Sequence, residues 1–281
     1  MIDPIATVDI GCGPQLKMLS IGDDHVAETY RTLGVRWSEP ASLKVWFQLA
    51  KRSSYAIDVG TFTGLYALVA ANANPLIKVA ALEPTRQVFS RLCLNIQING
   101  FQSQIAPLNF AAGDRLGECT LNHHDGIYCL DSLSTLLVES GPRPFWYSEE
   151  VKMLPLDSLP ELSSSDHRLT VIELPQTGPD IVKIDVEGYE LEVLSGMRKA
   201  IYIFRPILII ECLSPERLQE THDYLRESSY TPLLIDEKEM SLIGDVGEYC
   251  METTRNVLFY PHVKQSVIEQ IHNDSGVTVR L

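Results

Sequence analysis

The 281-residue sequence lacks any apolar run near the ~20 residues that a membrane-spanning helix requires. Its first residues, from Met1 to Pro4, also lack the basic and apolar regions of a signal peptide. Basic residues are few, because 23 Lys and Arg stand against 37 Asp and Glu, which gives a formal net charge of −14. A nucleic-acid-binding surface needs clustered positive charge, so this balance argues against a nucleic acid as partner. We expect a cytoplasmic protein with no membrane or nucleic-acid partner, and leave open whether it forms a homo-oligomer.

Cysteine is also scarce and shows no paired spacing. The six cysteines are Cys12, Cys93, Cys119, Cys129, Cys212 and Cys250. None of them forms a C-x-x-C pair, so the sequence predicts neither a zinc site nor a dithiol redox site. A free thiol inside an apolar pattern, such as that of Cys93 between two leucines, behaves as a small buried hydrophobic group.

The composition that remains is that of an ordinary globular protein, and its pattern predicts an α/β fold. From Tyr55 onward, short apolar runs alternate with longer helical stretches, which is typical of βαβ units and a parallel sheet. The expected strands are Tyr55–Val59, Lys78–Leu82, Ile105–Ala111, Asp180–Val186, Pro206–Cys212, Thr231–Ile235 and Asn256–Tyr260. The expected helices are Leu65–Ala73, Thr85–Asn99, Tyr189–Ala200, Pro215–Ser228 and Val263–His272. We therefore predict a doubly wound, mostly parallel sheet of the Rossmann-like class.

Two segments stand outside this alternation. Residues 1–53 are interpreted as an N-terminal helical extension, in which Ser38 and Pro40 mark the start of a helix that runs to about Arg52. Residues 54–281 would form the main domain. An irregular insertion after the third strand, over residues 115–179, interrupts it and holds one expected strand at Glu118–Asn122. This insertion is a candidate substrate-pocket segment.

The first chemical motif lies where the first strand ends, at Asp58-Val-Gly60-Thr61-Phe-Thr-Gly64. Gly60 would allow a tight turn, and Gly64 would let a ligand approach the helix N-terminus closely. The motif lacks the middle glycine of the dinucleotide fingerprint, which excludes a dehydrogenase of that type. Because Asp58 would repel a phosphate but could hold an ammonium group, the turn predicts a cationic ligand. A similar run at Asp9–Gly13 has no helix behind it and is interpreted as a loop.

Glu83 supplies the second part of the predicted cofactor site. It ends the second strand, where doubly wound sheets place an acid that binds the two hydroxyls of a ribose. A ligand with a ribose, a positive charge and no phosphate is S-adenosylmethionine. The alternative is that Asp58 and Glu83 merely cap the helices that follow them.

These residues, together with the run from Asp180 to Glu190 that contains Lys-Ile-Asp-Val-Glu-Gly-Tyr-Glu, resemble the FkbM family of methyltransferases. Ala111–Gly117 and Leu154–Leu159 are similar to two further family segments, whereas Ser163–Gly178 is longer and more irregular than the family pattern. The resemblance implies a class I methyltransferase fold, S-adenosylmethionine as cofactor, and a hydroxyl of a sugar or similar natural product as acceptor. Ala112 would then lie against the adenine.

Two acids are expected beside the transferred methyl group. Asp185 ends the fourth strand and Glu211 the fifth, and ligands of doubly wound sheets lie above such strand ends. A hydroxyl acceptor must lose a proton, either to a base or through a metal. Similar positions in catechol O-methyltransferase and its relatives carry magnesium ligands, but Cys212 follows Glu211 here and magnesium prefers oxygen. We therefore predict acid/base or substrate-orienting carboxylates without a metal.

Lys183 lies two residues before Asp185 and should point to the same side of the strand. It would either join the catalytic group or pack beneath the sheet with its ammonium group paired to an acid. Glu187 and Gly188 are interpreted as the first turn of the next helix.

Two further clusters, one polar and one aromatic, are weaker candidates for functional residues. His123-His124-Asp125 could bind a metal or act as a base, but an exposed turn is the interpretation we favour. The run from Phe145 to Tyr147 could line the acceptor pocket, although we favour a role in anchoring a loop.

Alternative functions are an N- or carboxyl-methyltransferase and a catalytically silent cofactor-binding module. The sequence has no Asn-Pro-Pro-Tyr-like tetrapeptide after the fourth strand, which argues against a base or amide nitrogen as acceptor.

Overall fold

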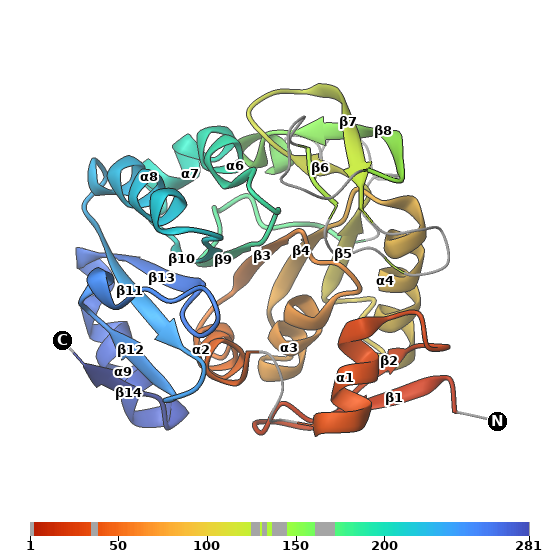
Figure 1. Ribbon diagram of the computed structural model, residues 1–281, viewed down its shortest axis with the longest axis horizontal. Coiled ribbons are helices and arrows are strands. Elements are labelled where there is room, and N and C mark those ends of the chain that lie inside the picture. Colours follow the sequence, from red (N-terminus) through yellow and green to blue (C-terminus); the bar gives the residue numbers. More distant parts are fainter. Residues whose placement is uncertain are drawn as a thin grey trace.

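A computed structural model describes residues 3–34, 39–124, 130, 134–136, 145–160 and 172–280. Its centre is a nine-stranded sheet in the order β14-β12-β11-β13-β10-β9-β3-β4-β5 (Figure 1). These strands are β3 Tyr55–Val59, β4 Lys78–Leu82, β5 Ile105–Leu108, β9 Ile181–Ile184, β10 Ile207–Glu211, β11 Tyr230–Asp236, β12 Ser241–Ile243, β13 Asn256–Pro261 and β14 Thr278–Arg280. The strands from β10 to β5 run parallel, and β13 is antiparallel to both β10 and β11. The predicted doubly wound, mostly parallel α/β class is confirmed.

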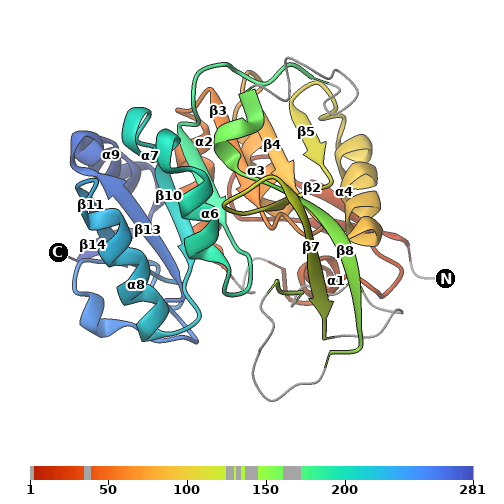
Figure 2. The same cartoon turned by 90° about the horizontal axis from the view of Figure 1, so that it is seen from above.

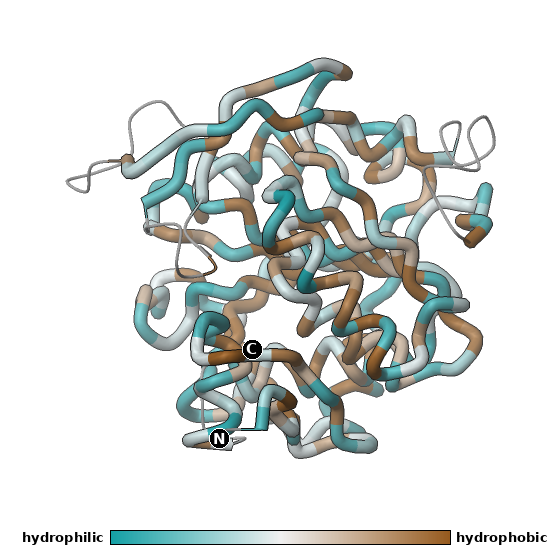
Figure 3. Tube along the Cα trace, turned by 90° about the vertical axis from the view of Figure 1, so that its right-hand side faces the viewer, coloured by the Kyte–Doolittle hydropathy of each residue, from teal (hydrophilic) through white to brown (hydrophobic). Residues whose placement is uncertain are grey.

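Helices cover both faces of this sheet (Figure 2). One face packs against α2 Pro40–Ala50, α3 Leu65–Ala73, α4 Arg86–Asn99 and α9 Gln265–Ser275. The other face packs against α6 Glu190–Gly196, α7 Arg198–Ile203 and α8 Pro215–Arg226. A hydrophobic core lies on each face of the sheet. Because side chains alternate along a strand, each buried strand contributes residues to both cores; in β9, Ile181 packs in one core and Val182 in the other. The most hydrophobic segments accordingly run through the middle of the molecule, between the two helical layers (Figure 3).

The structure divides two of the predicted elements. The third strand stops at Leu108, and Ala111–Ala112 form β6 in a separate sheet, since Asn109 turns the chain by donating to the carbonyls of Glu83 and Pro84 at 2.8 Å. The helix expected over Tyr189–Ala200 breaks at Met197 into α6 and α7.

The N-terminal extension is not wholly helical. It begins with a hairpin of β1 Ile5–Val8 and β2 Leu16–Leu19, which precedes α1 His25–Leu33 and α2. Both strands alternate buried and less buried residues, a period-two pattern that is easily missed in segments of four residues. The Asp9–Gly13 run forms the hairpin loop, as predicted, and Asp9 accepts a hydrogen bond from the Gly11 amide at 2.8 Å. The expected cap Ser38 lies outside the described residues.

The insertion contains an antiparallel pair, β7 Gly117–His123 and β8 Tyr147–Leu154, which forms a three-stranded sheet with β6. The prediction of an exposed turn is wrong for His123, which is fully buried in β7 and stacks on Tyr147 with ring centroids 4.1 Å apart. His124 contacts Phe145 with tilted rings, at 4.8 Å between ring centroids. These aromatic rings hold the two ends of the ribbon together, whereas Asp125 lies outside the described residues.

No helix in the described part of the chain has the length and apolar character needed to cross a membrane.

Candidate active site

Polar side chains of four neighbouring strands meet on one face of the sheet. Asp58 in β3 lies in register with Lys183 in β9, and Glu211 at the end of β10 lies in register with Asn256 in β13. Each of these residues lies an even number of positions from residues of its own strand that pack against α2 and α3. All four side chains therefore point to that face of the sheet. Asp185 comes two residues after Lys183 and continues the same side beyond β9.

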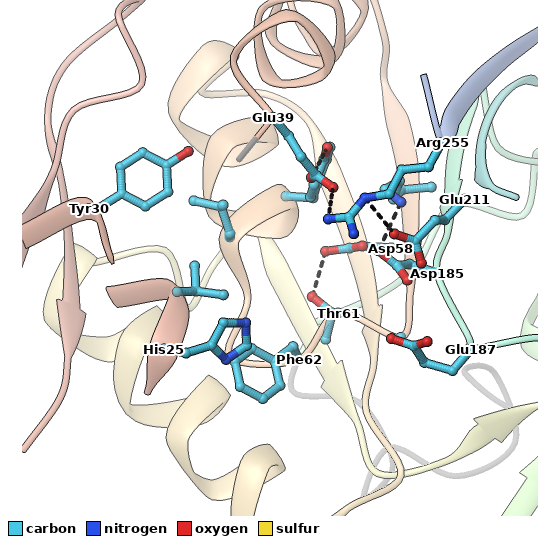
Figure 4. Close-up of a pocket in the computed structure, with 15 residues that line it drawn as sticks. His25, Tyr30, Glu39, Asp58, Thr61, Phe62, Asp185, Glu187, Glu211 and Arg255 are labelled. Carbon is cyan, nitrogen blue, oxygen red and sulfur yellow. Dashed lines mark hydrogen bonds and ion pairs between the residues drawn. The ribbon is translucent and has the colours of Figure 1, made fainter. Parts of the chain in front are cut away.

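These strand ends open into a cavity of about 330 Å³ (Figure 4). Its other walls come from α1, from the start of α2, from the loop and helix after β3, and from the loop before β13. The lining residues are His25, Val26, Tyr30, Glu39, Asp58, Gly60, Thr61, Phe62, Leu65, Tyr66, Lys183, Asp185, Glu187, Glu211 and Arg255. The cavity is therefore rich in carboxylates on the sheet side and more apolar toward α1.

A cluster of carboxylates lies at the bottom of this cavity. Asp185 and Glu211 come together, as the sequence predicted, and Glu39 joins them, with one oxygen of each within 4.8 Å of the others. Burial and the charge of Asp185 raise the pKa of Glu211 well above its ordinary value. Burial acts in the same direction on Asp185, but the Lys183 ammonium group, the hydrogen bond with Glu211 and the charge of Arg255 together outweigh it and lower the pKa of Asp185. The pKa values of the two neighbouring acids thus shift in opposite directions, which makes Asp185 the stronger acid of the pair.

Two cations already neutralise these acids. The Lys183 ammonium group lies 3.1 Å from Asp185 Oδ2 and 3.2 Å from Asn256 Oδ1, and its side chain is buried. Arg255 bridges Glu211 and Glu39, with nitrogen–oxygen distances of 3.0 and 3.5 Å. The expected pairing of Lys183 with an acid is confirmed, and Lys183 lines the cavity as well. A metal ion on the three carboxylates would have to displace these side chains.

Asp58 caps the helix that follows it and also lines the cavity. Its Oδ2 accepts hydrogen bonds from Thr61 Oγ1 and, at 2.8 Å, from the Ala67 amide in the first turn of α3. It therefore caps α3 and fixes the turn, yet it also lines the cavity. Burial raises the pKa of Asp58 to about 6.

Gly60 brings two strand ends into direct contact. Its φ of +71° lies in the left-handed region, and a Cβ atom added there would meet the Asp185 carbonyl oxygen at 1.7 Å. The absence of a side chain at Gly60 thus lets the loop after β3 pack against the loop after β9, which holds the cavity together.

A side chain at Gly64 would point into the packing between two helices. A Cβ atom on it would meet Leu92 Cδ1 of α4 at 2.6 Å, and Gly64 is not among the described residues that line this cavity or the smaller one beside it. The absence of a side chain here therefore allows α3 to pack against α4, and the role of Gly64 in approach of the ligand stays a prediction.

Gly64→Ala should accordingly lower the free energy of unfolding by about 2–4 kcal/mol, from overpacking and left-handed strain. Cofactor affinity of the folded protein should stay within about threefold, that is, within about 0.7 kcal/mol. Chemical denaturation and calorimetry measure the two quantities. Gly22→Ala is the matched control, because Gly22 has φ +94° and nothing within 4 Å of the added atom. A stable Gly64→Ala protein that no longer binds the cofactor would contradict this interpretation.

A second, smaller cavity of about 60 Å³ adjoins the first and shares four of its lining residues: Gly60, Phe62, Asp185 and Glu187. Its other lining residues are Val59, Glu83, Pro84, Thr85, Phe110, Ala111, Ala112, Leu121, Ser134, Leu136 and Val186. Glu83 and Ala112, both predicted to bind the cofactor, thus lie in one mainly apolar cavity. Glu83 Oε1 accepts a hydrogen bond from the Thr85 amide at 2.8 Å, and burial raises the pKa of Glu83 to about 8.

The comparison with known families decides the identity of this fold and site. Residues 58–232 match the model of the methyltransferase FkbM domain, and this stretch covers more than half of the chain. The chain belongs to the FkbM methyltransferase family. It is an S-adenosylmethionine-dependent methyltransferase, and its doubly wound, mostly parallel sheet is Rossmann-like.

Several known proteins are similar to this FkbM chain. Methyltransferase sdnD of Sordaria araneosa is 24% identical over 203 residues, which is 66% of this chain and 76% of that protein. The crystal structure of methyltransferase FkbM from Methylobacillus flagellatus is 18% identical with a TM-score of 0.48, covering 74% of this chain and 44% of that one. The O-methyltransferase of Bacillus cereus, solved in complex with SAH, is 10% identical with a TM-score of 0.46, covering 83% and 86%. This FkbM chain thus spans less than half of the Methylobacillus chain.

The two cavities suit the family's cofactor. None of the described residues that line the smaller cavity is Lys or Arg, so it offers no partner for a phosphate, whereas Glu83 can accept hydrogen bonds from hydroxyls. The larger cavity is lined by several carboxylates, which favour a cationic group. S-adenosylmethionine has an uncharged nucleoside, which suits the smaller cavity, and a positively charged amino-acid chain, which suits the larger one. The two parts would join beside Gly60, which lines both cavities.

Two residues at the junction of the cavities have unusual backbones. Phe62 and Glu187 have φ angles of +51° and +52°, a left-handed conformation that is uncommon outside glycine. Glu187 therefore does not begin a helix, as had been expected; α6 starts only at Glu190, whose side chain accepts from the Gly188 amide at 2.9 Å. Such strain is concentrated at functional sites, and here it turns both residues toward the cavities.

Sequence reasoning missed several residues of the larger cavity. Glu39 had been interpreted only as part of a helix start, yet its side chain accepts from Tyr66 at 2.7 Å and from Asn256 at 2.9 Å. Arg255 gave no signal at all, because it precedes a strand in a region without a recognisable motif. Tyr30 lies in a segment that had been assigned no element.

Proposed function

We propose that this FkbM-family protein is an O-methyltransferase that methylates a hydroxyl of a small molecule, such as a sugar or a similar natural product. The observation that carries the proposal is the Asp185–Glu211 pair. It is partly buried, it lies beside the Lys183 ammonium group, and it faces the junction of the two cavities. A carboxylate in this position can accept the proton that a hydroxyl acceptor must lose.

For the cofactor we assign one role to each part of the two cavities. Glu83 would accept hydrogen bonds from the ribose hydroxyls, and Ala112 would lie against the adenine, as their place in the smaller cavity supports. Asp58, Gly60 and Thr61, together with Asp185, would surround the amino-acid end. Gly64 would act on binding only through the packing of the turn.

The cofactor supplies an electrophilic methyl group when it is bound. The chain's own residues would then bind and deprotonate the acceptor. As the acceptor oxygen gains a carbon–oxygen bond, it gives its proton to the Asp185 carboxylate. Lys183 would hold that carboxylate in place and ionised, because its ammonium group lies 3.1 Å away. Glu211, fixed by Arg255 at 3.0 Å, would orient the pair.

Labelled S-adenosylmethionine offered with sugars, phenols, macrolides, amines and carboxylic acids tests this proposal. We expect label in alkali-stable ethers of a hydroxyl acceptor. Label in an alkali-labile ester or in an amine would contradict methylation of a hydroxyl. A protein that binds the cofactor but labels none of the acceptors would favour the silent binding module.

The protonation of Glu83 makes a separate prediction. With its pKa near 8, Glu83 must lose a proton to accept two ribose hydroxyls, so affinity for S-adenosylhomocysteine should strengthen as the pH rises toward 8 and level off above it. Glu83→Gln keeps an acceptor for the Thr85 amide but removes the charge. Calorimetry should show about tenfold weaker binding above pH 8, with the rise in affinity between about pH 7 and 8 abolished. The same pH profile in both proteins would remove Glu83 from the site.

A further inference from the structure

The side of the larger cavity opposite the carboxylates is formed by the N-terminal helix α1. His25, Val26 and Tyr30 line the cavity from this helix. Val26 and Tyr30 are one turn apart and so share a face. With Phe62 and Leu65 from the loop and helix after β3, they form a largely apolar wall. None of these α1 residues lines the smaller cavity.

This wall is held firmly in place. Asp23, just before α1, forms an ion pair with Arg91 of α4 at 2.7 Å, and both side chains are largely buried. Arg91 also donates to the Leu19 carbonyl at 2.6 Å, and Asp24 caps α1 by accepting from the Ala27 amide at 3.0 Å. The position of α1 relative to the sheet is therefore fixed by polar contacts with α4, and its inner face can act as a binding surface.

Tyr30 presents a hydroxyl to the cavity. Its side chain is only 4% exposed, and across the described residues its hydroxyl has no hydrogen-bond partner. Figure 4 shows the ring projecting from α1 with the hydroxyl turned toward the side of Glu39. Burial and the charges of Glu39 and Glu237 raise the pKa of Tyr30 above its ordinary value, so the group is a neutral phenol. A phenol that lines the cavity can donate a hydrogen bond to a molecule bound inside it.

We propose that Tyr30 binds the methyl acceptor, donating a hydrogen bond to one of its oxygens, while the apolar wall of α1, Phe62 and Leu65 contacts the acceptor's carbon skeleton. We also infer that the acceptor carries no negative charge. Both statements rest on the proposed function, because they take the larger cavity as the place where cofactor and acceptor meet.

The exclusion of anions follows from the charges that line the larger cavity. Five carboxylates face it, from Glu39, Asp58, Asp185, Glu187 and Glu211, against two permanent cations, Lys183 and Arg255. Both cations already pair with carboxylates of this set. The cofactor's own positive charge reduces the excess, but among the described lining residues no permanent cation is left without a carboxylate partner for an anionic acceptor. A neutral or ammonium compound with hydroxyl groups would find hydrogen-bond acceptors on the carboxylate side of the cavity and an apolar wall on the α1 side.

Three ring compounds of similar size test this inference: cyclohexanediol, aminocyclohexanol and hydroxycyclohexane carboxylate. Binding of each is followed by ligand-observed NMR, with the protein saturated by S-adenosylhomocysteine. The diol and the amine should bind and the carboxylate should not. Tyr30→Phe should weaken binding of the diol about three- to tenfold, the loss expected for one neutral hydrogen bond. Tyr230→Phe is the matched control, because Tyr230 is equally buried but donates to the Pro206 carbonyl at 2.9 Å, away from the cavity.

The two variants should also differ in stability. Tyr30→Phe removes no protein hydrogen bond and should leave the melting temperature nearly unchanged, whereas Tyr230→Phe should lower it. Failure of the diol and the amine to bind, equal binding of all three probes, or unchanged binding of the diol to Tyr30→Phe would each overturn the proposal. Calorimetry of S-adenosylhomocysteine on the same samples tests the cofactor site separately, so a protein that binds the cofactor but fails these tests contradicts only this inference.

Discussion

Replacing Asp185 by Asn should lower the turnover of methyl transfer by about 10²–10⁴, the usual contribution of a positioned base. The amide has nearly the shape of the carboxylate but cannot take a proton, and it no longer neutralises Lys183 at 3.1 Å. Affinity for S-adenosylhomocysteine should stay within a few-fold, about 1 kcal/mol or less. Initial rates with labelled cofactor and calorimetry separate the two effects. Asp223→Asn, which changes a more exposed acid on α8, should leave the rate unchanged.

The same assay distinguishes a base from a metal. Lys183 and Arg255 occupy the carboxylate cluster, so treatment with a chelator should leave the turnover of the wild-type protein unaltered. If activity is lost on chelation and restored by magnesium, the carboxylates act as metal ligands and these cations must move. If Asp185→Asn keeps its turnover and Asp223→Asn behaves alike, Asp185 is not the base.

Gly60→Ala should abolish cofactor binding and lower the free energy of unfolding by about 3 kcal/mol or more. The added Cβ would lie 1.7 Å from the Asp185 carbonyl oxygen, and that oxygen belongs to the backbone of a neighbouring buried strand end, so it cannot turn aside as a side chain could. Relief of the clash requires the loops after β3 and β9 to separate, and both loops line both cavities. Denaturant unfolding and calorimetry measure the two losses.

Gly276→Ala isolates the steric part of this effect. Gly276 has nearly the same backbone angle, φ +70° against +71° for Gly60, but nothing lies within 4 Å of its added atom. It should therefore show only the strain of a left-handed alanine, about 1–2 kcal/mol. If the two variants were equally stable, or if Gly60→Ala bound the cofactor normally, the close approach of the two loops would not be needed for the site.

The sequence alone predicted the strands of the central sheet other than β12 and β14, and the polar ends of the central strands. Short apolar runs between helical stretches are a local signal, so β3, α3 and β4 begin and end at the predicted residues. The meeting of Asp185 with Glu211 was also predictable, since neighbouring parallel strands end at one edge of the sheet. Glu83 and Ala112 could be placed in one cavity for the same reason.

Other features were decided only by tertiary packing. Gly64 and Gly60 look alike in sequence, yet one faces Leu92 and the other faces the Asp185 carbonyl, a difference that depends on which element packs above each turn. The histidine of β7 is buried because the chain returns over it at Tyr147, beyond the range of any local pattern.

The larger cavity shows most clearly which features can be predicted from sequence and which depend on tertiary packing. Glu39 and Arg255 are more than 200 residues apart in the chain, and they meet because α2 packs on the sheet beside β13. Tyr30 reaches the cavity because Arg91 ties the start of α1 to α4. A sequence motif consists of residues that are close together along the chain. The turn assigned to the cofactor is such a motif, so it could be predicted from the sequence. The residues that surround the acceptor come from separate elements, and only the packing of those elements brings them together.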